Sequence, residues 1–380
     1  MQPMQWTYLD TLTPQGIAAT LQTWRERQPG TGVLALVCEQ EQGAVVLLQQ
    51  ATAAATMPLL GAVVPGLIAG ARFWRRGAIL VAFDAATPRR IIPMPHVEHR
   101  ATDAAVASVA DFVVTHADEN GGDTLLLLMD TMIPDAASLL DRLYLEVGDQ
   151  VNYAGLCVGS ETFQSIPCLF DSETFATGAV LALMLRRHPG ATLAHHYRGG
   201  EALWVTTATT GSRVETIDGR PAFTVYQELM AREYGIELDR ENFYRYAVHF
   251  PFALNRAQGE SLVRIPVKVE EDGSVYCAGE VPENALLSVV RAVTPGRLET
   301  AREVGAGARS GEAMAGVLVF YCAGRLMHLD QEAATTELAA LAEALAPAPL
   351  AGALCLGEIS SGRQQYPAFH NATLVALPWT

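Results

Sequence analysis

Four histidines in the second half of the chain have types and surroundings that could serve a bound ligand. His195 and His196 are adjacent at the end of an apolar run, His328 lies in "GRLMHLD", and His370 lies in "FHNAT", directly before the last apolar run. Haem requires an apolar slot and an axial ligand, which is most often a histidine. Because neighbouring side chains of a strand point to opposite faces, at most one of His195 and His196 reaches a given pocket. For each of the four, a structural role within the fold is the alternative.

Two other side chains could complete such a site. Arg325 follows Cys322 in "YCAGR", and a guanidinium presents a planar fork of donors that suits a carboxylate. That carboxylate could belong to an amino-acid-like ligand or to a haem propionate, and a structural Arg at a helix start is the alternative. Asn371 is expected to shape the turn after His370. His96 and His99 lack further ligands at zinc-like spacing, so we expect no zinc site there.

A thiol enzyme is a further hypothesis, built on Cys355, Glu358 and His370. A Cys nucleophile needs a base, and the base needs a group that orients it. Cys355 lies within an apolar run, however, where burial makes a thiol inert. Cys157 occupies the matching place earlier in the chain without a comparable histidine. We therefore expect a packing role for Cys355, and a protein that is not an enzyme.

Composition limits the partners of the chain. Its 380 residues carry a formal net charge of −15, which argues against a nucleic-acid partner. No apolar run is long enough to span a membrane, and the first residues do not resemble a secretory signal. The 6 cysteines are scattered and form no CxxC pair. These features predict a cytoplasmic protein with reduced thiols.

A strand–helix–strand–loop–strand pattern occurs three times. The first apolar runs of the three units span residues 32–39, 123–130 and 316–325. The second runs span residues 58–68, 154–161 and 352–359. The closing runs span residues 77–83, 178–185 and 371–377. Apolar runs of this kind suit strands that are covered on both faces. The pattern predicts an α/β fold of repeated units that form mixed sheets with helices packed on their faces.

Each second run also carries a small residue followed by a glycine five positions later. The three pairs are Gly61 and Gly66, Ala154 and Gly159, and Gly352 and Gly357. A glycine at a strand exit permits a sharp turn or the close approach of a ligand. We call the strand exits at Gly66, Gly159 and Gly357 the first, second and third corners. Ligands of open α/β sheets bind at the carboxyl ends of strands. Residues 190–310 read differently, as an antiparallel module in the C-terminal half, with a hairpin at "EEDGS" and a helix around residues 223–234.

Several segments, in order, resemble the FIST family of sensory domains. They are "GVLALVCEQ", "AGLCVGSE", "LWVTTATTGSRVETIDGRPAFTVYQEL", "VKVEEDGSVYCAGEVPENALLSV", "GVLVFYCAGR" and "LCLGEISSG…FHNATLVAL". The resemblance runs from about residue 30 to the end and implies an N-terminal domain at residues 1–218 and a C-terminal domain at residues 219–380. Leu67 stands where the family pattern has an acid at the first corner, whereas Glu358 is retained at the third.

The resemblance implies a sensor of a small-molecule ligand. Some members of the family bind haem b, sense nitric oxide and modulate a histidine kinase, as in two-component regulation. For this chain the expected cofactor-binding residues are His195, His196, His370, Asn371, Arg325, Cys322 and Glu358, with His196 or His370 as iron ligand. The alternative is a metabolite such as an amino acid, without haem. Signalling would act in trans, and a homo-oligomer is left open.

Overall fold

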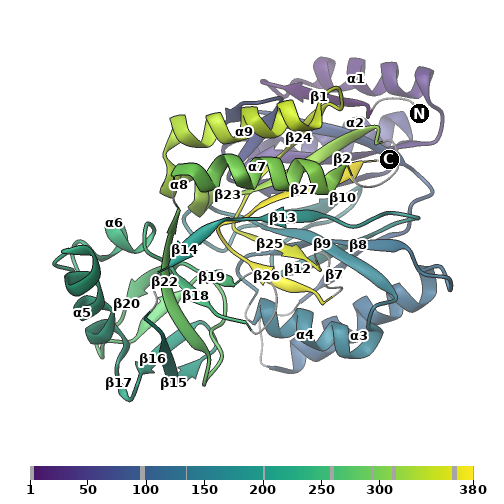
Figure 1. Cartoon of the computed structure of the whole chain (residues 1–380). Coiled ribbons are helices and arrows are strands. Elements are labelled where there is room, and N and C mark those ends of the chain that lie inside the picture. The colour runs from purple at the N-terminus through teal and green to yellow at the C-terminus, as the bar shows by residue number, and fades with distance from the viewer. Residues whose placement is uncertain are drawn as a thin grey trace.

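Most of the chain is built from three copies of one unit (Figure 1). The computed structural model describes residues 4–94, 99–133, 135–199, 202–256, 261–292, 294–309, 314–361 and 366–379. Each unit has an edge strand, a helix, a central strand, a second helix and four further strands. The predicted α/β fold with mixed sheets and repeated units is confirmed.

The elements of the first unit are β1 (Trp6–Leu9), α1 (Pro14–Arg27), β2 (Thr31–Cys38), the 3-10 helix η1 (Glu39–Ala44), α2 (Val45–Ala55), β3 (Leu59–Val64), β4 (Gly66–Ala69), β5 (Phe73–Trp74) and β6 (Ala78–Asp84). Those of the second are β7 (Arg89–Pro93), α3 (His99–His116), β8 (Asp123–Asp130), α4 (Ala136–Val147), β9 (Val151–Val158), β10 (Leu169–Asp171), β11 (Phe175–Ala176) and β12 (Ala179–Leu185). Those of the third are β13 (Thr192–Ala194), α7 (Thr294–Ala308), β23 (Gly316–Cys322), α8 (Ala323–Leu329), α9 (Gln331–Leu345), β24 (Leu350–Cys355), β25 (Gly357–Ser360), β26 (Ala368–His370) and β27 (Leu374–Trp379).

The three units exchange strands in a cycle. Within each unit the central strand pairs in parallel with the strand that follows the second helix: β2 with β3, β8 with β9, and β23 with β24. The next strand then crosses to another sheet, so that β4 pairs with β24, β10 with β3, and β25 with β9. Each six-stranded sheet therefore contains strands of two units. The predicted second runs, 58–68 and 352–359, are each two strands that lie in different sheets.

Glycines mark the places where this exchange occurs. A Cβ on Gly61, Gly155 or Gly352 would lie 2.2, 2.0 or 1.9 Å from the carbonyl oxygen of the residue paired with it on the central strand. The expected equivalence of Ala154 with Gly61 and Gly352 is therefore wrong by one residue, because Gly155 is the residue in that close contact. Gly159 turns the second corner with φ +124°.

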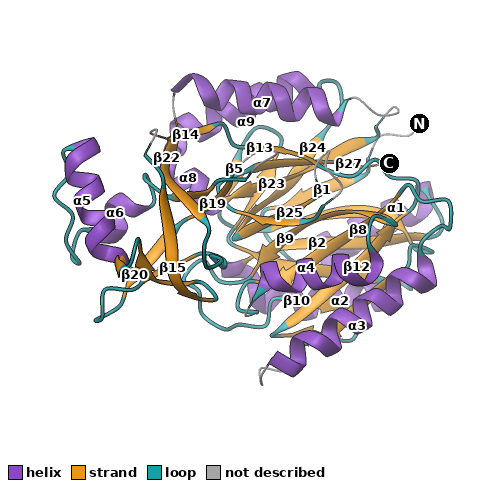
Figure 2. Cartoon of the chain, turned by 60° about the horizontal axis from the view of Figure 1, so that its bottom comes forward, coloured by secondary structure: helices purple, strands orange, loops and turns teal. Residues whose placement is uncertain are grey.

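Helices cover the outer face of each sheet, and the inner faces pack together. Helices α1 and α2 pack against each other, as do α3 with α4 and α7 with α9; Figure 2 shows α3 and α4 on one side of the sheets and α7 and α9 on the other. Leu36, Leu128 and Phe320, one from each central strand, belong to a single buried cluster. Apolar runs covered on both faces explain why the central strands could be recognised in the sequence.

An antiparallel module is inserted into the third unit, between β13 and α7. Its elements are β14 (Tyr197–Gly199), β15 (Trp204–Thr210), β16 (Arg213–Ile217), β17 (Arg220–Pro221), α5 (Ala222–Tyr234), α6 (Phe243–Ala247), β18 (Phe252–Leu254), β19 (Leu262–Arg264), β20 (Pro266–Val269), β21 (Val275–Cys277) and β22 (Leu286–Ala292). We call it the inserted module. Its nine-stranded sheet lies beside the units in Figure 1, with α8 between them.

The predicted hairpin at "EEDGS" and helix around residues 223–234 are confirmed by the β20–β21 pair and by α5. The predicted range 190–310 is too wide, because β13 and α7 belong to the third unit. The domain boundary predicted between residues 218 and 219 falls between β16 and β17 of the inserted module. That division of the chain stays a prediction.

Candidate functional site

The carboxyl ends of the three central strands lie at one end of the molecule, where the strand exchange occurs. The second corner contacts the first through Gly159, whose N–H donates to the Val63 carbonyl at 3.0 Å. The third corner contacts the second corner through Leu356, whose N–H donates to the Cys157 carbonyl at 2.9 Å. Such ends are where α/β sheets bind ligands.

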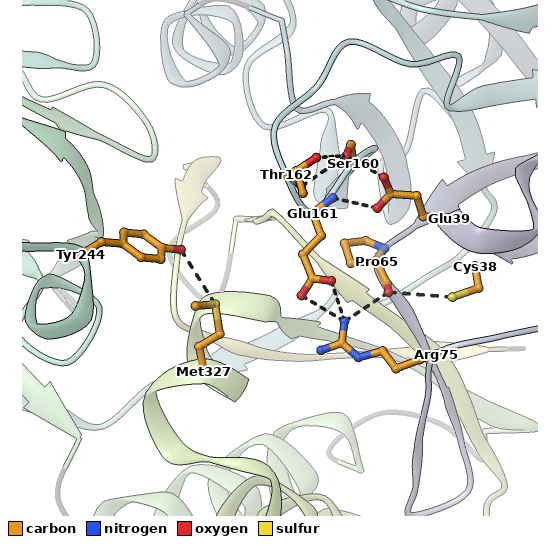
Figure 3. A network of polar contacts seen from close by, with 9 residues as sticks. All are labelled: Cys38, Glu39, Pro65, Arg75, Ser160, Glu161, Thr162, Tyr244 and Met327. Carbon is orange, nitrogen blue, oxygen red and sulfur yellow. Dashed lines mark hydrogen bonds and ion pairs between the residues drawn. The ribbon is translucent and has the colours of Figure 1, made fainter. Parts of the chain in front are cut away.

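A polar network joins the first and second corners (Figure 3). Glu39 accepts hydrogen bonds from the Ser160 hydroxyl at 2.6 Å and from the Glu161 N–H at 3.0 Å. Arg75 donates to the Pro65 carbonyl at 3.3 Å and pairs with the Glu161 carboxylate at 2.9 Å. The side chains of Arg75 and Glu161 are 44% and 41% exposed, so this pair adds little stability.

The inserted module approaches the same end. Figure 3 shows Tyr244 of α6 directed at Met327 of α8, and its hydroxyl donates to the Met327 sulfur at 3.9 Å. Burial and the nearby Glu161 raise the pKa of Tyr244. The corners and the inserted module therefore lie close together on this side of the molecule.

The third corner carries a buried acid on its crossing strand, β25. Glu358 is fully buried, and it accepts hydrogen bonds from the Cys355 thiol at 3.0 Å and from the Thr373 hydroxyl at 2.7 Å. Leu67 and Leu169 take the corresponding pairing positions in the other two sheets. Burial raises the pKa of Glu358 to about 7, against the lowering effect of these hydrogen bonds. A carboxyl group in this state can gain or lose a proton near neutral pH.

Three thiols adjoin this carboxyl group: Cys157, Cys322 and Cys355. All are buried, and burial followed by the charge of Glu358 raises the pKa of each. A buried thiol of raised pKa is a poor nucleophile. The three thiols therefore pack around a buried acid, and none of them has the properties of a catalytic thiol.

Replacing Glu358 by Gln will change how stability depends on pH. Because the folded pKa is raised, the carboxyl group contributes stability that is present at low pH and is lost as the pH rises through about 7. From pH 5 to pH 8, Glu358→Gln should gain roughly 2–4 kcal/mol relative to the wild type. Urea unfolding of both proteins at the two pH values measures this difference. Parallel pH dependences would contradict it.

His370 lies on β26, paired with Glu358 of β25. It is 6% exposed, and burial, then the charge of Arg264 and the nearby His195, lower its pKa to about 3. Its ring contacts the Ser360 carbonyl. His370 is therefore a neutral imidazole at physiological pH.

Arg264, on β19, approaches His370 from the inserted module. Its Nε donates to the Glu280 carbonyl at 2.8 Å, and its Nη1 donates to the Val263 and Phe369 carbonyls at 2.9 and 3.1 Å. The guanidinium also lies 5.4 Å from the centre of the Phe369 ring. Sequence analysis missed this residue, although an Arg inside the apolar run "LVRIPV" was a visible signal.

His195 lies near His370, and Tyr197 lies against Arg325. His195 is buried, with Nδ1 accepting from the Tyr197 N–H at 2.9 Å and Nε2 bonded to the Ser261 carbonyl at 3.0 Å. Burial first, and the charge of Arg325 among other causes, lower its pKa to about 4. The Tyr197 ring lies under the Arg325 guanidinium, and its environment includes Glu358 and Cys322. Tyr197 was not predicted as a site residue.

Two buried atoms in this region have no hydrogen-bond partner among the residues that the structure describes. They are the Tyr197 Oη and the Asn371 Oδ1, from side chains that are 7% and 1% exposed. Tyr197 packs in one small cluster with Cys322 and Ala372, the residue after Asn371. We call Tyr197, Arg264, Glu358, His370 and Asn371 the third-corner cluster.

The other predicted site residues have their polar groups engaged. His196 contacts the Thr300 hydroxyl at 3.1 Å and the Glu303 carboxylate at 3.1 Å. His328 accepts from the Ala292 N–H at 3.0 Å and contacts the Val248 carbonyl at 3.0 Å. Both ring nitrogens of His196 and of His328 are thus occupied, as are those of His195.

Arg325 uses all five of its N–H donors within the protein. Two bind the Glu337 carboxylate, two bind the His195 and Ala372 carbonyls, and one binds the Thr300 hydroxyl. It lies in α8 and is fully buried. In this arrangement Arg325 has no donor left for a ligand carboxylate, and its contacts are those of a residue that stabilises the fold.

These contacts limit which histidine could hold a haem iron. An iron ligand must present a free imidazole nitrogen, and His195, His196 and His328 each have both nitrogens engaged. His370 fits better, since it is neutral and the structure describes one ring contact for it. Within the described residues no group of three or more His, Cys, Asp and Glu side chains could hold a metal ion, and His96 lies outside them.

The fold and this cluster define an α/β protein with a buried polar site between its third unit and an inserted module. Comparison with protein families shows that the FIST N domain matches residues 33–220 and that the FIST C domain matches residues 222–361. The chain belongs to the FIST family of sensory, ligand-binding proteins. A comparison with curated proteins found no significant match. In the described part of the chain, no helix is long and apolar enough to cross a membrane.

Proposed function

We propose that this chain is a cytoplasmic sensor that binds a small polar molecule at the third-corner cluster and signals in trans to a partner such as a histidine kinase. The membership of the FIST family supports the sensory role and the small ligand. The six cysteines, all free and buried, agree with a reducing compartment. The histidine kinase is proposed as the partner because of the resemblance to the family.

One observation carries the location of the site. In the described residues, five buried side-chain atoms have no hydrogen-bond partner, and the two that belong to buried residues are the Tyr197 Oη and the Asn371 Oδ1. An unpaired buried polar group costs about 1–3 kcal/mol. Such a cost is typical of a functional site, where a ligand completes the missing bonds.

The test compares two buried tyrosines. Tyr226, whose hydroxyl donates to the Phe250 carbonyl at 2.8 Å, is the matched control for Tyr197. Without ligand, Tyr226→Phe should lose about 1 kcal/mol of unfolding free energy, whereas Tyr197→Phe should lose none or gain up to about 1 kcal/mol. A thermal-shift screen of metabolites should then stabilise the wild type more than Tyr197→Phe. Equal losses in the two variants, or no stabilising metabolite, would count against the site.

Haem b with nitric oxide as its signal is the second candidate, and the neutral imidazole of His370 favours it. His370 would hold the iron, which would supply the site for nitric oxide. Absorption spectra of protein purified after haem supplementation test it. A Soret band that shifts with nitric oxide and is lost in His370→Ala is expected for haem, while its absence, or its survival in that variant, excludes this ligation.

We propose binding rather than catalysis for this cluster. The thiol hypothesis needs a reactive Cys355, yet this residue is fully buried, its thiol donates to Glu358, and its pKa is raised well above that of a free thiol. Alkylation by iodoacetamide at pH 7 should therefore be slow. Rapid alkylation of Cys355 by the reagent would instead support the hypothesis of a thiol enzyme.

A further inference from the structure

We propose that the ligand is an anion, and that Arg264 binds its carboxylate or phosphate group; this inference rests on the third-corner cluster being the ligand site. It assigns to Arg264 the anchoring role that sequence analysis gave to Arg325. The two buried arginines of the region differ in how their charges are compensated.

Arg325 is neutralised within the fold. Its guanidinium makes two hydrogen bonds to the Glu337 carboxylate, at 2.8 and 2.5 Å, and both side chains are fully buried. Tyr321 donates to the same carboxylate at 2.6 Å. Nothing about this ion pair calls for an external anion.

Arg264 is buried to a similar degree, at 2% exposed, but its three hydrogen bonds go to neutral carbonyl oxygens. Among the described residues no carboxylate forms an ion pair with it, and its Nη2 makes no hydrogen bond to any of them. Burial lowers its pKa to about 10. A buried charge that forms no ion pair is destabilising, and an anionic ligand would offset this cost.

Glu280, Cys277 and Asp141 act on Arg264 against the effect of burial on its pKa, but none of them forms an ion pair with its guanidinium within the described residues. The pKa of His370 is lowered by burial and then by Arg264, His195 and Arg256, so the arginine charges are felt at the imidazole. The Glu280 carboxylate is turned to the start of α4, where it accepts from the Ala137 and Ser138 N–H groups. Arg264 and Arg256 thus place positive charge beside His370, in a chain with a net charge of −15. A guanidinium fork suits planar carboxylate and phosphate oxygens.

The experiment measures the melting temperature of the full chain in sodium salts at constant ionic strength, against chloride. One arm contains mono- and dicarboxylates, and the other contains inorganic phosphate and phosphate monoesters. We expect a saturable rise in one arm, which also identifies the anionic group. Absence of a saturable rise in both arms would overturn the inference.

Variants locate the effect. Arg264→Gln should weaken the apparent affinity by about tenfold or more, whereas Arg240→Gln should leave it unchanged. Arg240 is the matched control, because it also donates to two backbone carbonyls and lies over a Phe ring in the inserted module. If Arg264→Gln does not fold, Arg264→Lys keeps the charge but not the fork, and should still weaken binding by about tenfold. Unaltered affinity in the folded variant would overturn the role of Arg264.

The comparison of Tyr197→Phe with Tyr226→Phe does not depend on anions. If the tyrosine variants behave as expected and no anion binds, the proposed site stands and the anion inference fails. If Tyr197→Phe is destabilised like the control, the site itself fails.

Discussion

Replacing Glu337 by Gln is expected to destabilise the fold by about 3–5 kcal/mol. The substitution removes the negative charge that compensates the Arg325 guanidinium, while both side chains are fully buried. It also weakens the acceptor of the Tyr321 hydroxyl. Arg325 holds β13, α7 and the segment before β27 through the His195 carbonyl, the Thr300 hydroxyl and the Ala372 carbonyl. An uncompensated charge would therefore loosen the junction of the third unit with the inserted module.

Chemical unfolding of the single variant and of the double variant Arg325→Met/Glu337→Leu checks this result. Replacing both partners by apolar groups removes the unpaired charge, so the double variant should be more stable than Glu337→Gln. The three carbonyl and hydroxyl groups that Arg325 binds would still lose their donor, which keeps the double variant below the wild type. A Glu337→Gln protein within about 1 kcal/mol of the wild type would show that the pair does not stabilise the core.

Gly352→Ala is expected to be strongly destabilising, because its added Cβ would make the shortest contact found for any described glycine. The added Cβ would lie 1.9 Å from the Val319 carbonyl oxygen and 2.7 Å from its carbonyl carbon, and both are backbone atoms of the paired strand β23. No side-chain rotation relieves this contact, so β23 and β24 would have to part. We expect a loss of about 4 kcal/mol or more, or no folded protein.

Gly43→Ala is the control, because a Cβ at Gly43 meets nothing within 4 Å. It should fold with a stability close to that of the wild type. Gly61→Ala and Gly155→Ala should behave like Gly352→Ala, since they meet the carbonyls of Ala35 and Leu127 in the same way. Yield, circular dichroism and thermal unfolding of the four variants measure this. Tolerance of the Ala at all three exchange positions would contradict the proposed cause.

The central strands could be predicted because their signal is local. The run 123–130 has an unbroken apolar middle from Leu125 to Met129, and β8 spans Asp123–Asp130 as expected. The strand exchange could not be predicted in this way, because it has no local signal in the sequence. A glycine such as Gly66 or Gly357 is equally compatible with a bend within one sheet and with a crossing into another sheet. Pairing β4 with β24 depends on residues almost three hundred positions apart.

The site was predictable in part for the same reason. Glu358, His370 and Asn371 lie close together in sequence, beside a corner that the repeat had marked. Tyr197 and Arg264 lie in the inserted module and approach the cluster through the fold alone. The roles of the two arginines could not be told apart in the sequence, because Glu337 neutralises Arg325 from a different helix. Knowing which buried charge has a partner requires the tertiary structure.

A crystal structure with the most stabilising small molecule from the screens tests the central claim most directly. The account predicts that the molecule lies within hydrogen-bonding distance of the Tyr197 Oη or the Asn371 Oδ1, two buried atoms without hydrogen-bond partners among the described residues. Its charged group should contact Arg264. A ligand bound elsewhere, with both atoms bonded to protein groups, would contradict the assignment of the site.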